Sequence, residues 1–165
     1  MTAAIGALSE LAGMTVEAAA EARRQISHGR LQRGMAVLAA FAAAVSGFEA
    51  WTQHTRGAFA NRWMWTPIVL TPPLVLAAGA GLVNRRAAET ALPLTSLAML
   101  ADGVIGFALH LRGIQRMPGG YKLGTYNVTM GPPLFAPLLL TSAGLLGILA
   151  AFLRPEELGS ARCRQ

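Results

Sequence analysis

Two histidines occupy the same short motif at two places in the chain. His54-Thr55-Arg56-Gly57 and His110-Leu111-Arg112-Gly113 both read His-x-Arg-Gly, and each ends a long apolar run. A glycine, Gly47 or Gly103, lies seven residues before each histidine. The chain has 18 glycines but only three histidines, so the histidines carry the more specific signal. Imidazole is a ligand for iron and other transition metals, which makes this pair the leading candidate for chemistry.

The pair predicts a b-type haem. Residues seven apart share a helix face, so Gly47 would lie beneath His54 and Gly103 beneath His110. Such glycines could leave a slot for a flat ligand, whose iron the two imidazoles would bind axially from opposite sides. The alternative is that the small residues let two helices pack closely in a membrane. Both histidines would then be unliganded side chains at the interface.

Arg56 and Arg112 follow the histidines and would pair with the haem propionates, because guanidinium binds carboxylates bidentately. A quinone, a lipid or another metal stays open as the ligand. Copper is a lesser alternative, since Met64, Met117 and Met130 are predicted to lie on the same side of the membrane as the histidines. These methionines show no Met-x-x-Met spacing.

Two carboxylates fall inside apolar runs. Glu49 lies in the last third of one run and Asp102 at the centre of another. Charged groups within a membrane span are costly, so each is a functional candidate. We expect Asp102 to be hydrogen-bonded by Ser46, Thr95 or Ser96, either as a structural group or as part of a proton relay with Glu49. No Lys or Arg lies in a predicted span, which disfavours a small transporter.

The elements that must position these residues are membrane helices. The chain of 165 residues is 53% hydrophobic and only 13% charged, against about 25% charged for a soluble domain. A span needs about 20 apolar residues. The predicted fold is therefore all-α, an integral membrane four-helix bundle within residues 34–153. The expected spans are residues 34–53, 66–83, 92–111 and 132–153.

The spans read as one two-helix hairpin written twice, about 34–86 and 90–153. After each His-x-Arg-Gly motif a Pro-Pro-Leu opens the next apolar run, Pro72-Pro73-Leu74 and Pro132-Pro133-Leu134. The order of elements predicts a tandem duplication, with a pseudo-two-fold axis along the membrane normal. The symmetry would place His54 and His110 at equal depth.

Residues 1–33 are expected to form a cytoplasmic amphipathic segment, with Thr15 capping a helix through Val16–Arg24, and residues 154–165 a cytoplasmic tail. Four spans place both termini on the same side of the membrane. This side has more basic residues than the other, which predicts that it is cytoplasmic. Nine bases lie on that side: Arg23, Arg24, Arg30, Arg33, Arg85, Arg86, Arg154, Arg162 and Arg164. Five lie on the other: Arg56, Arg62, Arg112, Arg116 and Lys122. The expected location is the cell membrane, as in a bacterial inner membrane, with the histidines at its outer face.

Composition excludes several function classes. The net charge is +6, but the arginines stand at the ends of apolar runs, which topology explains better than nucleic-acid binding does. One cysteine, Cys163, allows no intrachain disulfide and no cysteine-based metal site. No nucleophile–base set, P-loop or zinc helix is present.

The predicted role is a non-catalytic subunit or anchor of a membrane assembly, in contact with the lipid bilayer and with other membrane or outer-side protein subunits. In its specific form the chain binds haem b and passes electrons between an outer partner and the quinone pool. The competing prediction is a purely structural interaction protein without a cofactor.

Overall fold

The computed structural model describes residues 2–27 and 29–153, which are almost wholly helical and contain no strand. The all-α prediction is confirmed. The elements, in chain order, are α1 (Thr2–Ser27), α2 (Arg30–Arg56), η1 (Arg62–Trp65), α3 (Thr66–Gly81), α4 (Arg85–Glu89), α5 (Ala91–Gln115), η2 (Gly120–Leu123), α6 (Gly124–Met130) and α7 (Ala136–Phe152). The predicted tail, with Cys163, lies outside the described residues.

Three helical segments are long and apolar enough to cross a membrane: Arg30–Arg56, Arg62–Gly81 and Arg85–Gln115. They correspond to three of the four predicted spans. The fourth apolar helix, α7, has 17 residues, or about 25 Å of helix against a hydrocarbon core of about 30 Å. These lengths are consistent with a helical membrane protein that has three clear spanning helices.

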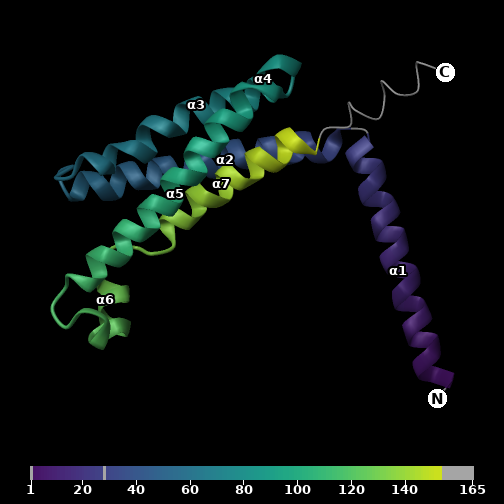
Figure 1. The fold of residues 1–165 in the computed structure, drawn as a ribbon, viewed down its shortest axis with the longest axis horizontal. Helices are drawn as coiled ribbons and strands as arrows, with labels where there is room; N and C mark the ends of the chain where they lie inside the picture. The colour runs from purple at the N-terminus through teal and green to yellow at the C-terminus, as the bar shows by residue number, and fades with distance from the viewer. Residues whose placement is uncertain (1, 28, 154–165) are drawn as a thin grey trace.

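The long helices pack as two hairpins. α2 packs against α3, α5 packs against α7, and the hairpins join through α2 on α7 and α3 on α5. In Figure 1 the two loop ends, one between α2 and α3 and one beside α6, lie apart. The buried core is built largely from small side chains, which let helices approach closely. It includes Ala39, Ala43, Leu74, Met99 and Ala143.

Gly47 and Gly103 sit at helix contacts within the hairpins. A Cβ atom at Gly47 would overlap the side chain of Thr71 on α3, and one at Gly103 would overlap Thr141 on α7. The Thr71 hydroxyl donates to the Pro67 carbonyl (2.7 Å), four residues earlier in its own helix. These glycines therefore serve close packing of α2 on α3 and of α5 on α7.

The expected start of the second span at residue 66, with Pro72-Pro73 inside it, is confirmed, whereas the expected start of the fourth span at Pro132 is wrong because α7 begins at Ala136. Pro72 and Pro73 lie inside α3, whereas Pro132 and Pro133 lie in the loop before α7. The prolines in the first turns of α3 and α7 are Pro67 and Pro137, where a missing N–H costs no hydrogen bond. The element that recurs at the two helix starts is thus Pro-x-x-x-Thr, ending at Thr71 and Thr141.

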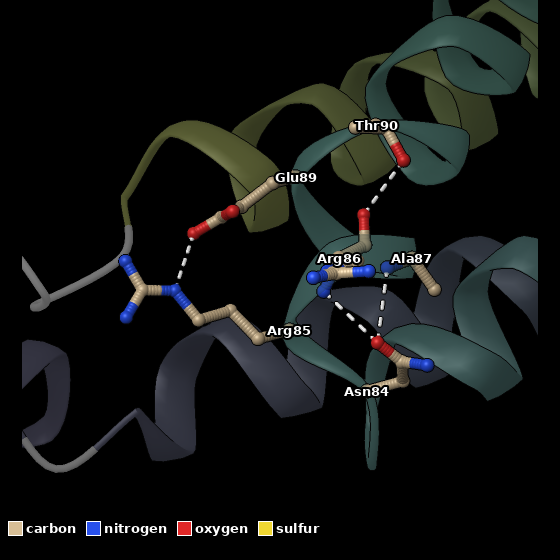
Figure 2. A network of polar contacts seen from close by, with 6 residues as sticks. All are labelled: Asn84, Arg85, Arg86, Ala87, Glu89 and Thr90. Carbon is tan, nitrogen blue, oxygen red and sulfur yellow. Dashed lines mark hydrogen bonds and ion pairs between the residues drawn. The ribbon is translucent and has the colours of Figure 1, made fainter.

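A compact turn joins α3 to α5 through α4 (Figure 2). Asn84 caps α4: its Oδ1 accepts from the backbone N–H of Arg86 (2.9 Å). Arg85 pairs with Glu89 (2.7 Å), and the Thr90 hydroxyl donates to the Arg86 carbonyl (2.7 Å). An Asn N-cap of this kind stabilises a helix by about 1 kcal/mol. The turn fixes the hairpin connection at the end opposite the histidine loops.

The N-terminal segment is a single long helix. α1 begins at Thr2, and Thr15 lies inside it with its hydroxyl donating to Ala12 O (2.8 Å), so the predicted cap at Thr15 is wrong. α1 extends away from the hairpins in Figure 1. Gly29, with φ of 68°, separates it from α2. A left-handed residue at this junction suits glycine because it has no Cβ.

We expect Gly103→Ala to destabilise the protein more than Gly47→Ala. At Gly103 the added methyl meets backbone atoms of Thr141 and Pro137, which cannot rotate away, whereas at Gly47 it meets only the Thr71 side chain. Overpacking of this kind costs about 1–3 kcal/mol. The measurement is the free energy of unfolding in detergent micelles. Gly79→Ala is the control, because nothing lies within 4 Å of the new methyl; equal losses at all three glycines would contradict the packing described here.

Candidate functional site

A cavity of about 590 Å³ lies between the loop ends of the two hairpins. Its polar lining includes both motif histidines, both intramembrane carboxylates and two arginines: His54, His110, Glu49, Asp102, Arg112 and Arg116. Its apolar lining comes mainly from α5 and from the first turns of α3 and α7. The structure therefore brings together residues that the sequence singled out on separate helices.

Each histidine is held by a backbone carbonyl of its own hairpin. His54 Nδ1 lies 2.8 Å from the carbonyl oxygen of Met64 in η1. His110 Nδ1 lies 2.7 Å from the carbonyl oxygen of Pro133, just before α7. Because a carbonyl only accepts, each Nδ1 must carry the hydrogen and donate it. Nε2 of each neutral ring is then left as the acceptor and metal-binding nitrogen.

An aromatic pair supports His54. The edge of Phe59 faces the imidazole, with ring centroids 6.3 Å apart at 74°, and Phe59 stacks on Trp65 at 4.1 Å. Ala58 and Phe59 have φ of 48° and 49°. The left-handed conformation costs a non-glycine residue about 1–2 kcal/mol, and such strain concentrates at functional sites. Nothing in the local sequence signals this conformation, so the arrangement was not predicted.

Asp102 is buried and faces the cavity from α5. Two groups lie close enough to interact with its carboxyl group. They are the Thr66 side chain, at the start of α3, and the His54 imidazole of α2. It lies eight residues before His110 on the same helix, or about 12 Å along the axis. Because both residues line one cavity, the cavity extends inward from the loop ends. Glu49 lines the same space from α2.

No hydrogen bond is observed between Asp102 and the three expected partners in the described residues. The Thr95 hydroxyl donates to Ala91 O within α5 (2.7 Å). Ser96 is buried beside Gly147 of α7, and its Oγ has no hydrogen-bond partner within the described ranges. Ser46 lines the cavity. Thr66 was missed because the sequence does not show that the start of α3 faces the middle of α5.

Arg112 and Arg116 line the cavity, whereas Arg56 does not. Arg56 is exposed outside the lining, and its Nη1 donates to Gln53 Oε1 (3.3 Å). Arg116 was missed because the third span was expected to end at Leu111, whereas α5 continues to Gln115. Residues four apart share a helix face, so this extension places Arg112 and Arg116 together.

Glycines beside the cavity differ from those predicted. Gly47 and Gly103 are absent from the lining, which instead contains Gly106 and Gly113 of α5. Gly113 does not end the helix, as its place in the motif suggested. A Cβ there would lie 3.0 Å from the Pro132 ring, so glycine lets the loop before α7 pass close to α5.

The lining offers no ready site for a bare metal ion. Within residues 2–27 and 29–153, no group of three or more His, Cys, Asp or Glu side chains is placed to hold one. Met117 and Met130 do not line the cavity with Met64. Two imidazoles alone are nevertheless the complete protein ligand set of a bis-histidine haem.

No protein-family model matches this chain, and no curated protein or solved structure matches it significantly. The chemistry of the cavity is therefore the basis for a functional assignment.

We expect both neutral imidazoles to be the Nδ1–H tautomer, in which the proton lies on the nitrogen that faces the carbonyl. Nitrogen-15 NMR of the ligand-free protein labelled at histidine reports the tautomer directly. His54→Ala and His110→Ala variants assign the two signals. Solvent-exposed histidine in water favours the Nε2–H form, so Nε2–H signals from either residue would contradict the hydrogen bonds to Met64 and Pro133.

Proposed function

We propose that this chain is an electron-transfer subunit of a membrane assembly and binds one b-type haem between His54 and His110. The observation that carries the proposal is that both imidazoles line one cavity with Nδ1 fixed by a backbone carbonyl. Such a hydrogen bond orients the ring and raises the basicity of Nε2, as is usual for histidines that ligate metals. Two prepared imidazoles match the axial ligand set of a low-spin b-type haem.

The position of the two helices supports axial ligation from opposite sides. α2 and α5 each pack mainly on α3 and α7, so they occupy opposite walls of the helix arrangement. Each contributes one histidine near its C-terminal end. The cavity volume falls within the roughly 300–1,000 Å³ of small-molecule and cofactor sites. The apolar lining that would contact a macrocycle is Pro67, Ile105, Leu109, Pro137 and Leu140.

Charged groups in the lining fit the two parts of a haem. Arg112 and Arg116 supply two guanidinium groups, which bind propionate carboxylates bidentately. Glu49 and Asp102 place two carboxyl groups beside the same space, and such polar groups near a haem tune its reduction potential. The haem supplies one-electron redox chemistry. The chain binds it, orients it and sets the charge around it.

The contacts within each hairpin support a tandem duplication. In both hairpins a histidine bonds a carbonyl shortly before the helix-starting proline, and a glycine packs on the threonine four residues after that proline. His54 and Pro67 are 13 residues apart, and His110 and Pro137 are 27 apart. The second loop is thus longer by 14 residues (27 − 13), a difference that α6 and η2 account for in large part.

We place the protein in the cell membrane with α7 as the fourth span of a four-helix bundle. The residues before Ala136 and after Phe152, namely Phe135 and Leu153, extend the apolar stretch of α7. Both termini then lie on one side, taken as cytoplasmic because it has the most bases. The cavity opens toward the outer side, where a soluble redox partner would meet the haem, and the quinone pool is the exchange partner within the bilayer.

A structural subunit without a cofactor is the alternative. The composition of the cavity argues against this alternative. Burying a carboxyl group in a membrane-spanning helix costs free energy, so such a group is expected where it has a function. Two arginines and two carbonyl-bonded histidines around the same space would add unnecessary polar groups to a packing interface.

The haem proposal predicts the spectrum of the protein purified from haem-replete cells. Reduced-minus-oxidised difference spectra should show the α-band of a b-type cytochrome, with about one haem per chain. His54→Ala and His110→Ala should each lower haem content at least tenfold, and Arg116→Ala by a smaller factor. Thr55→Ala, an exposed neighbour, is the matched control. A colourless preparation after haem reconstitution, or colour retained in both histidine variants, would refute haem binding.

Cysteine accessibility tests the orientation. In a Cys163→Ser background, Ala60→Cys should react with a membrane-impermeant maleimide added to intact cells, while Val83→Cys reacts only after lysis. Both positions are exposed in the structure, so a difference in labelling reports sidedness and not burial. Labelling of Val83→Cys alone in intact cells would invert the proposed topology.

A further inference from the structure

The loop end of the α5–α7 hairpin carries a small ordered cap formed by residues 120–130, that is, η2 and α6. Asn127 is fully buried, and its Nδ2 donates to the carbonyls of Pro118 (3.0 Å) and Gly120 (2.7 Å). The Tyr121 hydroxyl donates to Leu111 O (3.0 Å), which fastens the cap to α5. These hydrogen bonds order the cap and hold it in a fixed orientation relative to α5.

The cap exposes apolar side chains although Asn127 beside them is buried. Leu123, Tyr126 and Met130 follow helical spacing and are 54%, 61% and 66% exposed. Large apolar side chains held open on a rigid element mark an interaction surface. Tyr is among the residue types enriched at protein interfaces, and so are Trp and Met.

Uncompensated positive charge lies on the loop segments of both hairpins, at the cavity end of the molecule. The two loop segments, residues 54–65 and 112–131, contain five basic residues and no acid. All five are exposed: Arg56, Arg62, Arg112, Arg116 and Lys122. None of them forms an ion pair with a carboxylate of the described part of the chain. Bases on outer loops run against the usual topological bias. Arg112 and Arg116 line the cavity, so Arg56, Arg62 and Lys122 are the ones that call for a partner of opposite charge.

We propose that this basic cap surface docks the acidic face of a soluble protein on the outer side of the membrane. A second copy of the chain would present the same positive charge and be repelled. Anionic lipid is a weaker occupant, because the negative surface potential belongs chiefly to the cytoplasmic leaflet. Opposite charge would also steer the partner to the cavity end of the molecule. The proposal rests on the proposed orientation but does not require haem.

Site-specific photocrosslinking in intact cells tests the proposal. The photoreactive residue p-benzoylphenylalanine replaces Tyr126, and the crosslinked peptide is identified by mass spectrometry. The expected product joins residue 126 to one soluble protein through a peptide with net negative charge. The same probe at Leu94, 70% exposed in the first third of a spanning segment and far from the cap, should give no polypeptide product.

Charge reversal separates docking from a cofactor defect. Arg62→Glu with Lys122→Glu should lower the crosslink yield at least fivefold. Neither residue lines the cavity, so cofactor content serves as the folding control and should be unchanged. Arg33→Glu, at the opposite end of α2, should leave the yield unchanged. Products with phospholipid only or with a second copy of the chain, no product at all, or a yield that survives the double reversal would each overturn the proposal.

Discussion

Two hydrogen bonds from imidazole to backbone determine what this cavity can do. Nδ1 of His54 donates to Met64 and Nδ1 of His110 donates to Pro133, and each bond joins the C-terminal end of one helix to the segment that begins the next. Each bond therefore fixes the hairpin loop and the tautomer together. With both Nδ1 atoms engaged, the nitrogens left free are the two that bind metals best. The other features of the site depend on this pairing.

Close packing within the hairpins is what allows a cavity between them. Gly47 and Gly103 bring each pair of helices together against threonine, while α2 on α7 and α3 on α5 join the pairs toward the other end. The loop ends are left apart, and the polar side chains gather there. Asp102 faces this space with Thr66 and His54 close enough to interact with its carboxyl group, while the Thr66 hydroxyl donates to Trp63 O (2.9 Å).

Periodicity and residue types were enough to predict an all-helical chain, helices long and apolar enough to cross a membrane, and the shared location of the two histidines. They also placed Asp102 on a spanning helix as a candidate site residue. Arg56, predicted as a propionate partner, lies outside the lining: its side chain is exposed and bonds Gln53 of its own helix. Arg116 was missed because glycine at 113 normally stops a helix, whereas here tertiary contact with Pro132 requires it.

Boundaries set by proline were the weakest part of the sequence reasoning. Pro132 was expected to start the fourth span but lies four residues before α7, whereas Pro72-Pro73 falls inside α3 as expected, since proline can continue a membrane helix when its neighbours satisfy the freed backbone groups. The weaker sequence match, Pro67-x-x-x-Thr71 with Pro137-x-x-x-Thr141, is the one with equivalent contacts. Contacts between helices decide such cases, and one sequence does not contain them.

The measurement that tests the central claim most directly is electron paramagnetic resonance of the oxidised protein reconstituted with haem. Ligation by both imidazoles predicts a low-spin ferric signal. In the His110→Gly variant, the fraction of protein that still binds haem through His54 alone should be high-spin, and free imidazole should restore both haem content and the low-spin signal. A low-spin signal that persists after both histidines are replaced, or the absence of any bound haem, would contradict the account.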